Sequence, residues 1–109
     1  MFSLQGKTAL ITGSARGLGF EIAAGLASQG ARVILNGRRE DALDAAVAAL
    51  RERGAQAQGW CFDVAQEASL PAAFALLSGQ VGPIEILVNN VGMRDRRGLF
   101  DFSHADVLK

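Results

Sequence analysis

A glycine-rich turn between a predicted strand and a predicted helix constrains this chain more than any other feature. The turn reads Thr12-Gly13-Ser14-Ala15-Arg16-Gly17-Leu18-Gly19, and segment 7–12 before it has the character of a buried strand. After the turn, Ile22, Ala23 and Leu26 recur at the three-to-four spacing of a helix that packs on a sheet. Glycine adopts positive φ and has no Cβ, so the backbone amides at the start of that helix are open to an anion such as a pyrophosphate. The turn therefore predicts a nucleotide-binding site.

A glycine-rich turn by itself is a weak sign of such a site, because glycine also ends helices and punctuates loops for structural reasons. The preceding strand and the following helix supply the context that the motif requires. Within the turn, we predict that the residues in contact with the bound nucleotide are Gly13, Ser14, Arg16, Gly17, Leu18 and Gly19.

Strand and helix signals alternate along the rest of the chain with short connections between them. Further strands are predicted at 31–36, 57–62 and 84–89. A helix with its apolar stripe at Leu43, Ala46, Val47 and Leu50 lies between the second and third strands, and a helical segment at about 66–80 lies between the third and fourth. This order predicts an α/β fold, a Rossmann-type doubly wound parallel sheet with four strands, and one domain over residues 1–109.

Composition excludes several classes of protein. The 109 residues suffice for one domain, and a hydrophobic fraction of 50% supports a real core. Eleven basic and eleven acidic side chains cancel, which argues against nucleic acid or a membrane surface as a partner. No apolar run approaches the length of a membrane span, and we expect a cytoplasmic protein. The single cysteine, Cys61, has no partners at metal-ligand spacing and is predicted to be a buried strand residue.

Three motifs in order give the chain a family resemblance. Thr12-Gly13-x-x-x-Gly17-x-Gly19, the pair Asp63-Val64 after the third strand, and Asn89-Asn90-Val91-Gly92 after the fourth are similar to the motifs of the short-chain dehydrogenase/reductase family. Val91 replaces the alanine of the family's Asn-Asn-Ala-Gly signature, and its branched side chain could alter packing beside the cofactor. The chain resembles the N-terminal, cofactor-binding part of such an enzyme, and the match covers nearly all of its length.

The resemblance implies further contacts with a dinucleotide. Asp63 and Val64 would contact the adenine, although an aspartate at this point could instead cap a helix or close a turn. Asn90, Val91 and Gly92 would carry the chain past the nicotinamide ribose. Asn89 is expected to be structural, with its amide bridging neighbouring strand ends.

The stretch after the second strand bears on the choice of dinucleotide. An acidic residue there usually takes the ribose 2′-hydroxyl of NAD, and an arginine accommodates the 2′-phosphate of NADP. Gly37 stands where the acidic residue would align, Arg38 follows it, and Arg16 resembles a second basic position of NADP-preferring members. We therefore expect NADP rather than NAD; the alternative is that these arginines and Arg39 are solvated surface residues, Arg39 above all.

The family's catalytic residues are absent from this chain. Relatives use a Ser and a Tyr-x-x-x-Lys motif, whose tyrosine exchanges a proton with the substrate oxygen, and this sequence contains no tyrosine. His104 is a solvated surface residue on our interpretation, not a substitute. We thus assign no catalytic residue and expect the chain to be inactive alone, truncated before that region. Three interpretations stay open: the N-terminal part of an NADP-dependent oxidoreductase acting on a carbonyl or alcohol, a self-standing nucleotide-binding module, or a non-functional remnant.

The last segment carries the few hints about substrate. Segment 94–97 holds three arginines that could face an anionic substrate, but Asp95 and Asp101 favour a self-paired solvated loop. Ser103 opens a short helix signal at the end of the sequence. Together with Asn36-Gly37-Arg38-Arg39, the arginine loop is similar to that of gluconate 5-dehydrogenase-like family members. Full-length relatives are expected to be homo-oligomers.

Overall fold

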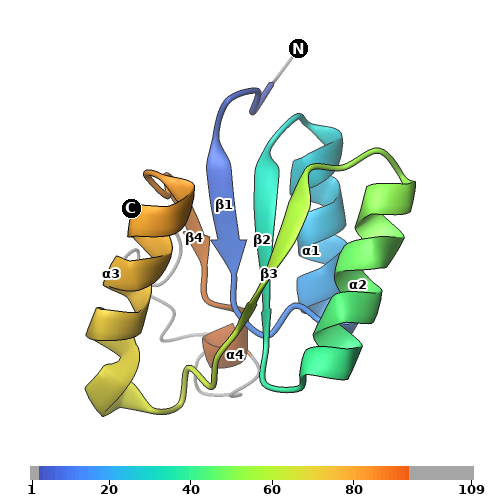
Figure 1. Cartoon of the computed structure of the whole chain (residues 1–109). Coiled ribbons are helices and arrows are strands. Elements are labelled where there is room, and N and C mark those ends of the chain that lie inside the picture. The colour runs from blue at the N-terminus through green and yellow to red at the C-terminus, as the bar shows by residue number, and fades with distance from the viewer. Residues whose placement is uncertain (1–2, 94–109) are drawn as a thin grey trace.

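The computed structural model describes residues 3–93, which form a parallel sheet of four strands flanked by helices (Figure 1). The elements follow in the order β1 (Thr8–Ile11), α1 (Gly17–Ser28), β2 (Arg32–Gly37), α2 (Glu40–Glu52), β3 (Ala57–Cys61), a 3₁₀ turn η1 (Glu67–Ser69), α3 (Leu70–Val81), β4 (Ile86–Val88) and α4 (Asn90–Met93). The predicted α/β class and the alternation of strands with helices are confirmed.

The strands lie in the order β3-β2-β1-β4, and every pair is parallel. The chain first moves outward from β1 through β2 to β3, then returns to the other side of β1 with β4. Leu10 in β1 pairs with Ile34 on one side and with Leu87 on the other. This reversal next to β1 is the point at which open parallel sheets bind ligands, at the carboxyl ends of the strands.

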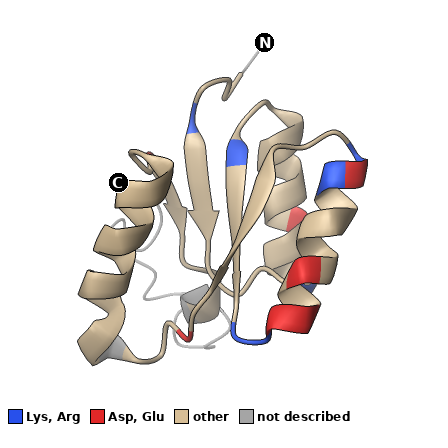
Figure 2. Ribbon diagram, viewed as in Figure 1, with Lys and Arg blue, Asp and Glu red and all other residues tan. Residues whose placement is uncertain are grey.

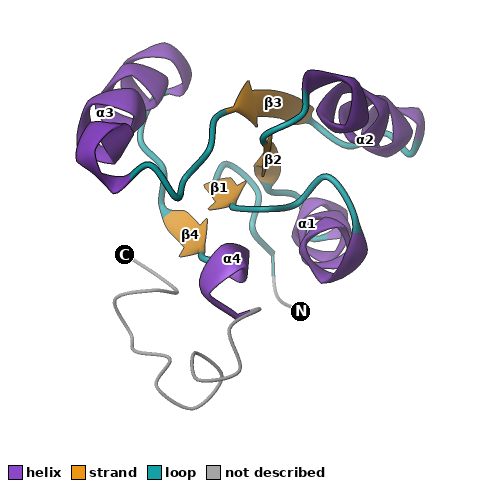
Figure 3. Ribbon diagram, turned by 90° about the horizontal axis from the view of Figure 1, so that it is seen from below, coloured by secondary structure: helices purple, strands orange, loops and turns teal. Residues whose placement is uncertain are grey.

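Helices cover both faces of the sheet. Helices α1 and α2 lie on one face and α3 lies on the other (Figure 3). Because side chains alternate along a strand, Ile11 and Leu35 pack on the side of α1 and α2, whereas Leu10 and Ile34 pack against Leu77 of α3. The central strands are therefore apolar in continuous runs, as expected for a parallel sheet buried on both faces.

Glycines with positive φ follow α1, α2 and α3, whereas a 3₁₀ turn precedes α3. Gly30 and Gly54 follow α1 and α2 with φ of +102° and +87°, the left-handed conformation that ends helices. Pro71 lies in the first turn of α3, where a proline is tolerated. Ser69 stands at the N-cap position, but its hydroxyl donates to the Gln66 carbonyl at 3.4 Å and makes no capping bond. The helix start is set by the preceding 3₁₀ turn.

The prediction for Cys61 is wrong. The residue is exposed, and its Sγ lies 3.5 Å from the Arg38 carbonyl oxygen, to which the thiol donates. Cys61 ends β3, which is the outer strand of the sheet, so no neighbouring strand covers it in the described part of the chain. Its apolar surroundings in the sequence gave no sign that β3 lies at an edge.

Charge is distributed unevenly over the helices. Acidic and basic side chains line the outward face of α2, whereas α3 carries no Lys, Arg, Asp or Glu (Figure 2). Within residues 3–93, no helix is both long enough and apolar enough to cross a membrane. The arginine loop of 94–97, Ser103 and His104 lie outside the described residues.

Candidate functional site

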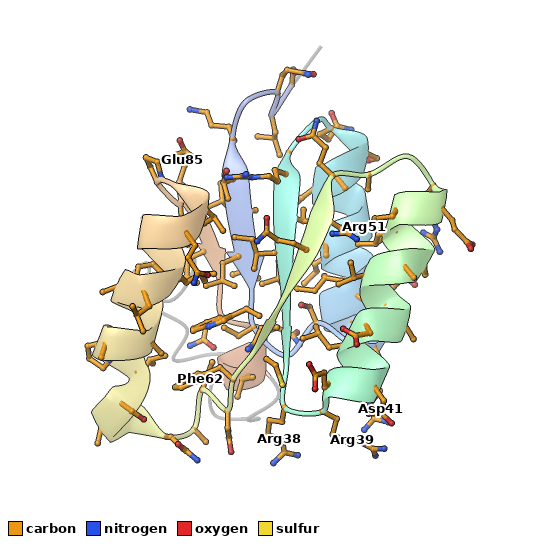
Figure 4. All side chains as sticks on the ribbon, in the orientation of Figure 1. Arg38, Arg39, Asp41, Arg51, Phe62 and Glu85 are labelled. Atoms are coloured by element: carbon orange, nitrogen blue, oxygen red, sulfur yellow. The ribbon has the colours of Figure 1, made fainter. Side chains whose placement is uncertain are left out.

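The predicted site residues gather at the carboxyl ends of the strands. There the glycine turn after β1, the β2–α2 connection, the end of β3 and α4 surround a cavity of about 340 Å³. Figure 4 shows Arg38, Arg39 and Phe62 at this end of the sheet and Glu85 at the opposite end. Among the predicted residues, those that line the cavity are Gly13, Arg16, Arg38, Asp63, Val64 and Val91. Ser14, Gly17, Leu18, Gly19 and Asn90 lie outside this lining, and Gly92 lies in α4.

Glycine is needed at positions 13, 17 and 19 of the turn for different structural reasons. Gly13 and Gly17 adopt φ of +57° and +65°, which other residues rarely do. Around Gly17 a Cβ would meet nothing within 4 Å, so this side of the turn is open to a ligand. A Cβ on Gly19, in contrast, would lie 2.5 Å from the Gly13 carbonyl oxygen. The turn thus combines an open side at the start of α1 with a closely packed side, and the helix N-terminus favours an anion at the open side.

Asn36, at the end of β2, holds the glycine turn in place. Its Oδ1 accepts from the Gly13 amide at 3.0 Å, and its Nδ2 donates to the carbonyls of Trp60 and Phe62, each at 3.0 Å. Its backbone N–H donates to the Ser14 hydroxyl at 2.9 Å, and the Ser14 amide donates back to its carbonyl at 2.8 Å. One side chain therefore connects the ends of β1, β2 and β3. Sequence reasoning assigned Asn36 no such role; the signal was an amide in an otherwise apolar strand.

Ser14 points into the protein. It is fully buried, and its hydroxyl donates to the Ile11 carbonyl at 2.6 Å while it accepts from the Asn36 amide. These bonds use the hydroxyl for the shape of the turn. Leu18, the second residue of α1, is 58% exposed. The contact of both residues with a nucleotide stays a prediction.

The Asn-Asn-Val-Gly motif joins β4 and α4 to the glycine turn. Asn90 is buried, and its Nδ2 donates to the Gly13 carbonyl at 2.9 Å. The Thr12 hydroxyl donates to Asn89 Oδ1 at 3.1 Å and accepts from the Val91 amide at 3.2 Å. Asn89 thus bridges neighbouring strand ends, as the sequence predicted. Asn90 Oδ1 is buried and has no hydrogen-bond partner within residues 3–93.

Val91 matters for the shape of the cavity. Its side chain is 38% exposed, and its Cγ2 lies 2.9 Å from where a Cβ on Gly13 would stand. The branched residue that departs from the family signature therefore packs on the glycine turn itself, which leaves no room for any side chain at position 13.

The three arginines near the cavity differ in their partners. Arg39 pairs with Asp41 at 3.2 Å, with side chains 77% and 74% exposed. Hydrogen bonding from the Ala42 amide, together with the nearby Arg39 guanidinium, lowers the pKa of the Asp41 carboxyl below its ordinary value. Arg16 and Arg38 are also exposed, and neither forms an ion pair within residues 3–93. Two unpaired guanidinium groups therefore stand at the mouth of the cavity.

Asp63 follows β3 and closes a turn. Its Oδ1 accepts from the Ala65 amide at 3.0 Å, which is the turn aspartate considered as an alternative. Its Oδ2 takes part in no hydrogen bond among the described residues and remains able to accept from a ligand. The turn role and a ligand contact are thus compatible, because they use different oxygens.

A second groove and the acidic residues offer no alternative site for a nucleotide or a metal ion. A larger groove of about 630 Å³ runs between α2 and the outer side of β3, and its charged lining residues include Glu40, Asp44 and Arg51. It contains no glycine turn at a helix N-terminus, so the smaller cavity is the candidate nucleotide site. The described residues contain no cluster of His, Cys, Asp and Glu that could hold a metal ion.

Comparison with known proteins identifies the family. The family model for short chain dehydrogenases matches residues 7–109. Gluconate 5-dehydrogenase of Gluconobacter oxydans (strain 621H) is 42% identical over 106 residues, which cover 97% of this chain and 41% of that protein. 5-Keto-D-gluconate 5-reductase of Escherichia coli (strain K12) is 40% identical, again over 97% of this chain, and 42% of that protein is covered. The chain spans about 40% of the length of these curated relatives.

Solved structures give the same picture. A gluconate 5-dehydrogenase from Burkholderia cenocepacia J2315, in complex with NADP and tartrate, matches with a TM-score of 0.76 and 44% identity over 82% of this chain and 35% of that chain. L-Sorbose reductase from Gluconobacter frateurii, complexed with NADPH and L-sorbose, matches with a TM-score of 0.73 and 36% identity over 81% of this chain and 34% of that chain. The resemblance to gluconate 5-dehydrogenases is confirmed. The glycine turn, the strand order and these matches show that the chain belongs to the short-chain dehydrogenase family.

Proposed function

We propose that this chain is the cofactor-binding part of an NADP-dependent oxidoreductase that transfers hydride between NADP(H) and a carbonyl or alcohol. The observation that carries the proposal is the cavity itself. It joins a glycine turn at a helix N-terminus to two arginines without ion-pair partners in residues 3–93. The residues fit a dinucleotide, because a Cβ on Gly17, the first residue of α1, would meet nothing within 4 Å, so the backbone amides at this helix N-terminus are open to a phosphate.

The preference for NADP follows from charge at the end of β2. Gly37 carries no carboxylate to accept from a ribose 2′-hydroxyl or to repel a 2′-phosphate. Arg16 and Arg38 line the cavity from two different loops, so both guanidinium groups can donate to one phosphate. The similar proteins solved with NADP or NADPH support the same choice.

The residues of this chain would bind and orient the cofactor and leave proton transfer to others. When bound, the cofactor supplies or accepts the hydride. The α1 N-terminus would hold the pyrophosphate, and Asp63 Oδ2 would accept from the adenine amino group. Residues Asn90, Val91 and Gly92 of α4 would lie beside the nicotinamide end of the cofactor. No residue of the Tyr-x-x-x-Lys type is available here, because the sequence has no tyrosine.

Two features favour the interpretation of this chain as part of a larger enzyme over that of a self-standing module. The outer edge of β4 pairs with no strand within residues 3–93, and the side chains of β4 are only half-buried. Asn90 Oδ1 is a buried acceptor without a donor in the same range, and such groups are normally satisfied in a finished fold. A further strand beside β4 would pair with its open edge, and it could also bring a hydrogen-bond donor to Asn90 Oδ1.

The substrate class proposed is a polyhydroxy acid or its keto form. The similar proteins named for gluconate and 5-keto-D-gluconate support it. The arginine loop of 94–97, which could receive an anionic substrate, lies outside the described residues. Homo-oligomerisation of a full-length form and a cytoplasmic location stay predictions from the sequence.

Titration calorimetry with NADPH and NADH tests the cofactor assignment. Arg38→Ala should weaken NADPH binding roughly 10–100-fold, because a hydrogen bond to a charged group contributes about 1.5–3 kcal/mol. NADH binding should stay unchanged. Arg39→Ala is the comparison variant and should have the smaller effect, because Arg39 also lines the cavity but is already paired with Asp41. Tighter binding of NADH than of NADPH, with no effect of Arg38→Ala, would show that the assignment is wrong.

Thermal unfolding and turnover separate the remaining interpretations. Saturating NADPH should raise the melting temperature if the cavity binds it, since a ligand that binds only the folded state stabilises that state. A chain that aggregates and shows no shift would favour a non-functional remnant. NADPH oxidation by this chain with 5-keto-D-gluconate should be absent, and measurable turnover would refute the need for further residues.

A further inference from the structure

Phe62 stands directly after β3, at the same edge of the sheet as the glycine turn. Its backbone N–H donates to the Gly37 carbonyl at 3.0 Å, and its carbonyl accepts from Asn36 Nδ2 at 3.0 Å. Both bonds tie Phe62 to the end of β2, where Arg38 follows, and Figure 4 shows the two labelled residues at this edge. The position of Phe62 is therefore fixed by the fold.

The ring of Phe62 stacks on the ring of Trp60. Their centroids lie 5.1 Å apart and their planes differ by 7°. The residues are two apart in an extended segment, so they share one side of it, and both are half-buried. Stacking fixes the orientation of each ring. The Asn36 amide donates to the carbonyls of both residues, so the same side chain that holds Gly13 also holds this aromatic pair.

Phe62 also lines the cavity that contains Arg16 and Arg38. It is the one aromatic residue among the described residues of that lining. If the arginines hold the 2′-phosphate, the adenine lies close by, because the base and the 2′-phosphate are attached to neighbouring carbons of one ribose. A purine needs a flat apolar surface for its face and a hydrogen-bonding group for its edge.

We propose that Phe62, backed by Trp60, is the wall on which the adenine ring of NADP lies. This inference rests on the proposed function, since it assumes a dinucleotide in the cavity. Asp63, the next residue, offers its Oδ2 to the edge of the same base, so consecutive residues supply the stacking surface and the hydrogen bond. Every base has a π-face, and stacking on an aromatic side chain is a strong and general contact.

The test compares binding of NADPH, of 2′,5′-ADP and of nicotinamide mononucleotide to variants of this chain. Phe62→Leu should weaken NADPH and 2′,5′-ADP about tenfold, the typical effect of losing one base stack, and leave nicotinamide mononucleotide unchanged. Phe62→Tyr keeps the ring and should bind within about threefold of the unaltered chain. Phe74→Leu is the control, because Phe74 packs in the same cluster as Trp60 but does not line the cavity.

Trp60 supplies a second readout. It is the only tryptophan and the sequence has no tyrosine, so selectively excited emission reports on this stack alone. Adding 2′,5′-ADP, which does not absorb that emission, should change it in the unaltered chain and not in Phe62→Leu. If the unaltered chain binds neither NADPH nor 2′,5′-ADP, the proposed function and this inference fail together. If it binds both, and Phe62→Leu binds 2′,5′-ADP as tightly as Phe74→Leu does, only the adenine wall is overturned.

Discussion

Replacing Gly19 by Ala should damage both the stability and the cofactor site of this protein. The new Cβ would stand 2.5 Å from the Gly13 carbonyl oxygen and 2.7 Å from Asn90 Nδ2. Those two atoms form the 2.9 Å hydrogen bond that joins α4 to the glycine turn. The substitution thus forces apart α1, the turn and α4 at the point where they meet.

The magnitude follows from the geometry. The contact with the Gly13 oxygen would have to lengthen from 2.5 Å to at least 3.0 Å, and the opposing atoms are backbone or buried amide, which cannot turn aside. Overpacking of this kind costs about 1–3 kcal/mol. In a domain of this size that corresponds to a fall in melting temperature of roughly 5–20 °C. Because the turn itself must shift, NADPH binding should weaken by about tenfold or more, or about 1.4 kcal/mol.

The same helix offers a matched control. Gly25 lies inside α1, and a Cβ there would meet nothing within 4 Å. Gly25→Ala should raise stability by about 0.5–1 kcal/mol, because glycine loses more chain entropy in a helix than alanine does. NADPH binding should be unaffected.

Thermal unfolding followed by circular dichroism measures the first effect, and NADPH titration measures the second. Equal melting temperatures for Gly19→Ala and Gly25→Ala would refute the packing argument. Normal NADPH affinity in a destabilised Gly19→Ala would instead show that the closely packed side of the turn is unconnected to binding.

Three further substitutions follow from the site. Gly37→Asp should reverse the preference from NADPH to NADH in titrations, because its Cβ has room, with the nearest atom at 3.4 Å, and its carboxylate would repel a 2′-phosphate; an unchanged ratio of dissociation constants would contradict this. Asn36→Asp should cost about 2–3 kcal/mol in chemical unfolding, because an acceptor then faces two carbonyls; wild-type stability would count against it. Asp41→Asn should lower the melting temperature slightly near neutral pH and not in acid. The Ala42 amide and Arg39 lower the pKa of Asp41, so the contribution of its carboxylate to stability disappears as the pH falls through the folded pKa. A larger effect of the substitution in acid than at neutral pH would contradict this.

The order and type of the main elements could be predicted from local pattern. Apolar runs marked the strands, and apolar residues at helical spacing marked α1 and α2. The exact bounds of the strands could not be predicted in this way, because a strand extends only as far as its pairing with a neighbouring strand. Segment 84–89 was predicted as the fourth strand, but pairing with β1 covers only Ile86 to Val88.

The parts of the site that sequence reasoning missed depend on contacts between distant segments. Asn36 reaches Gly13 at 23 residues' separation and Phe62 at 26, and nothing local announces either contact. The error over Cys61 has a similar cause, since whether a strand lies at the edge depends on strand order and not on its own residues. The motif residues were easier, because glycine geometry at a strand-to-helix turn is a local property.

The central claim is that the cavity at the carboxyl ends of β1, β2 and β3 binds NADP. Backbone amide shifts in ¹⁵N-labelled chain, followed by NMR during NADPH titration, test it most directly. The largest changes should fall in the glycine turn 13–19, at Arg38 and in the pair Asp63 and Val64. Amides of Asp44 and Arg51, which line the larger groove beside α2, should not move. Shifts confined to that groove, or no shift in the glycine turn at saturating NADPH, would contradict the assignment.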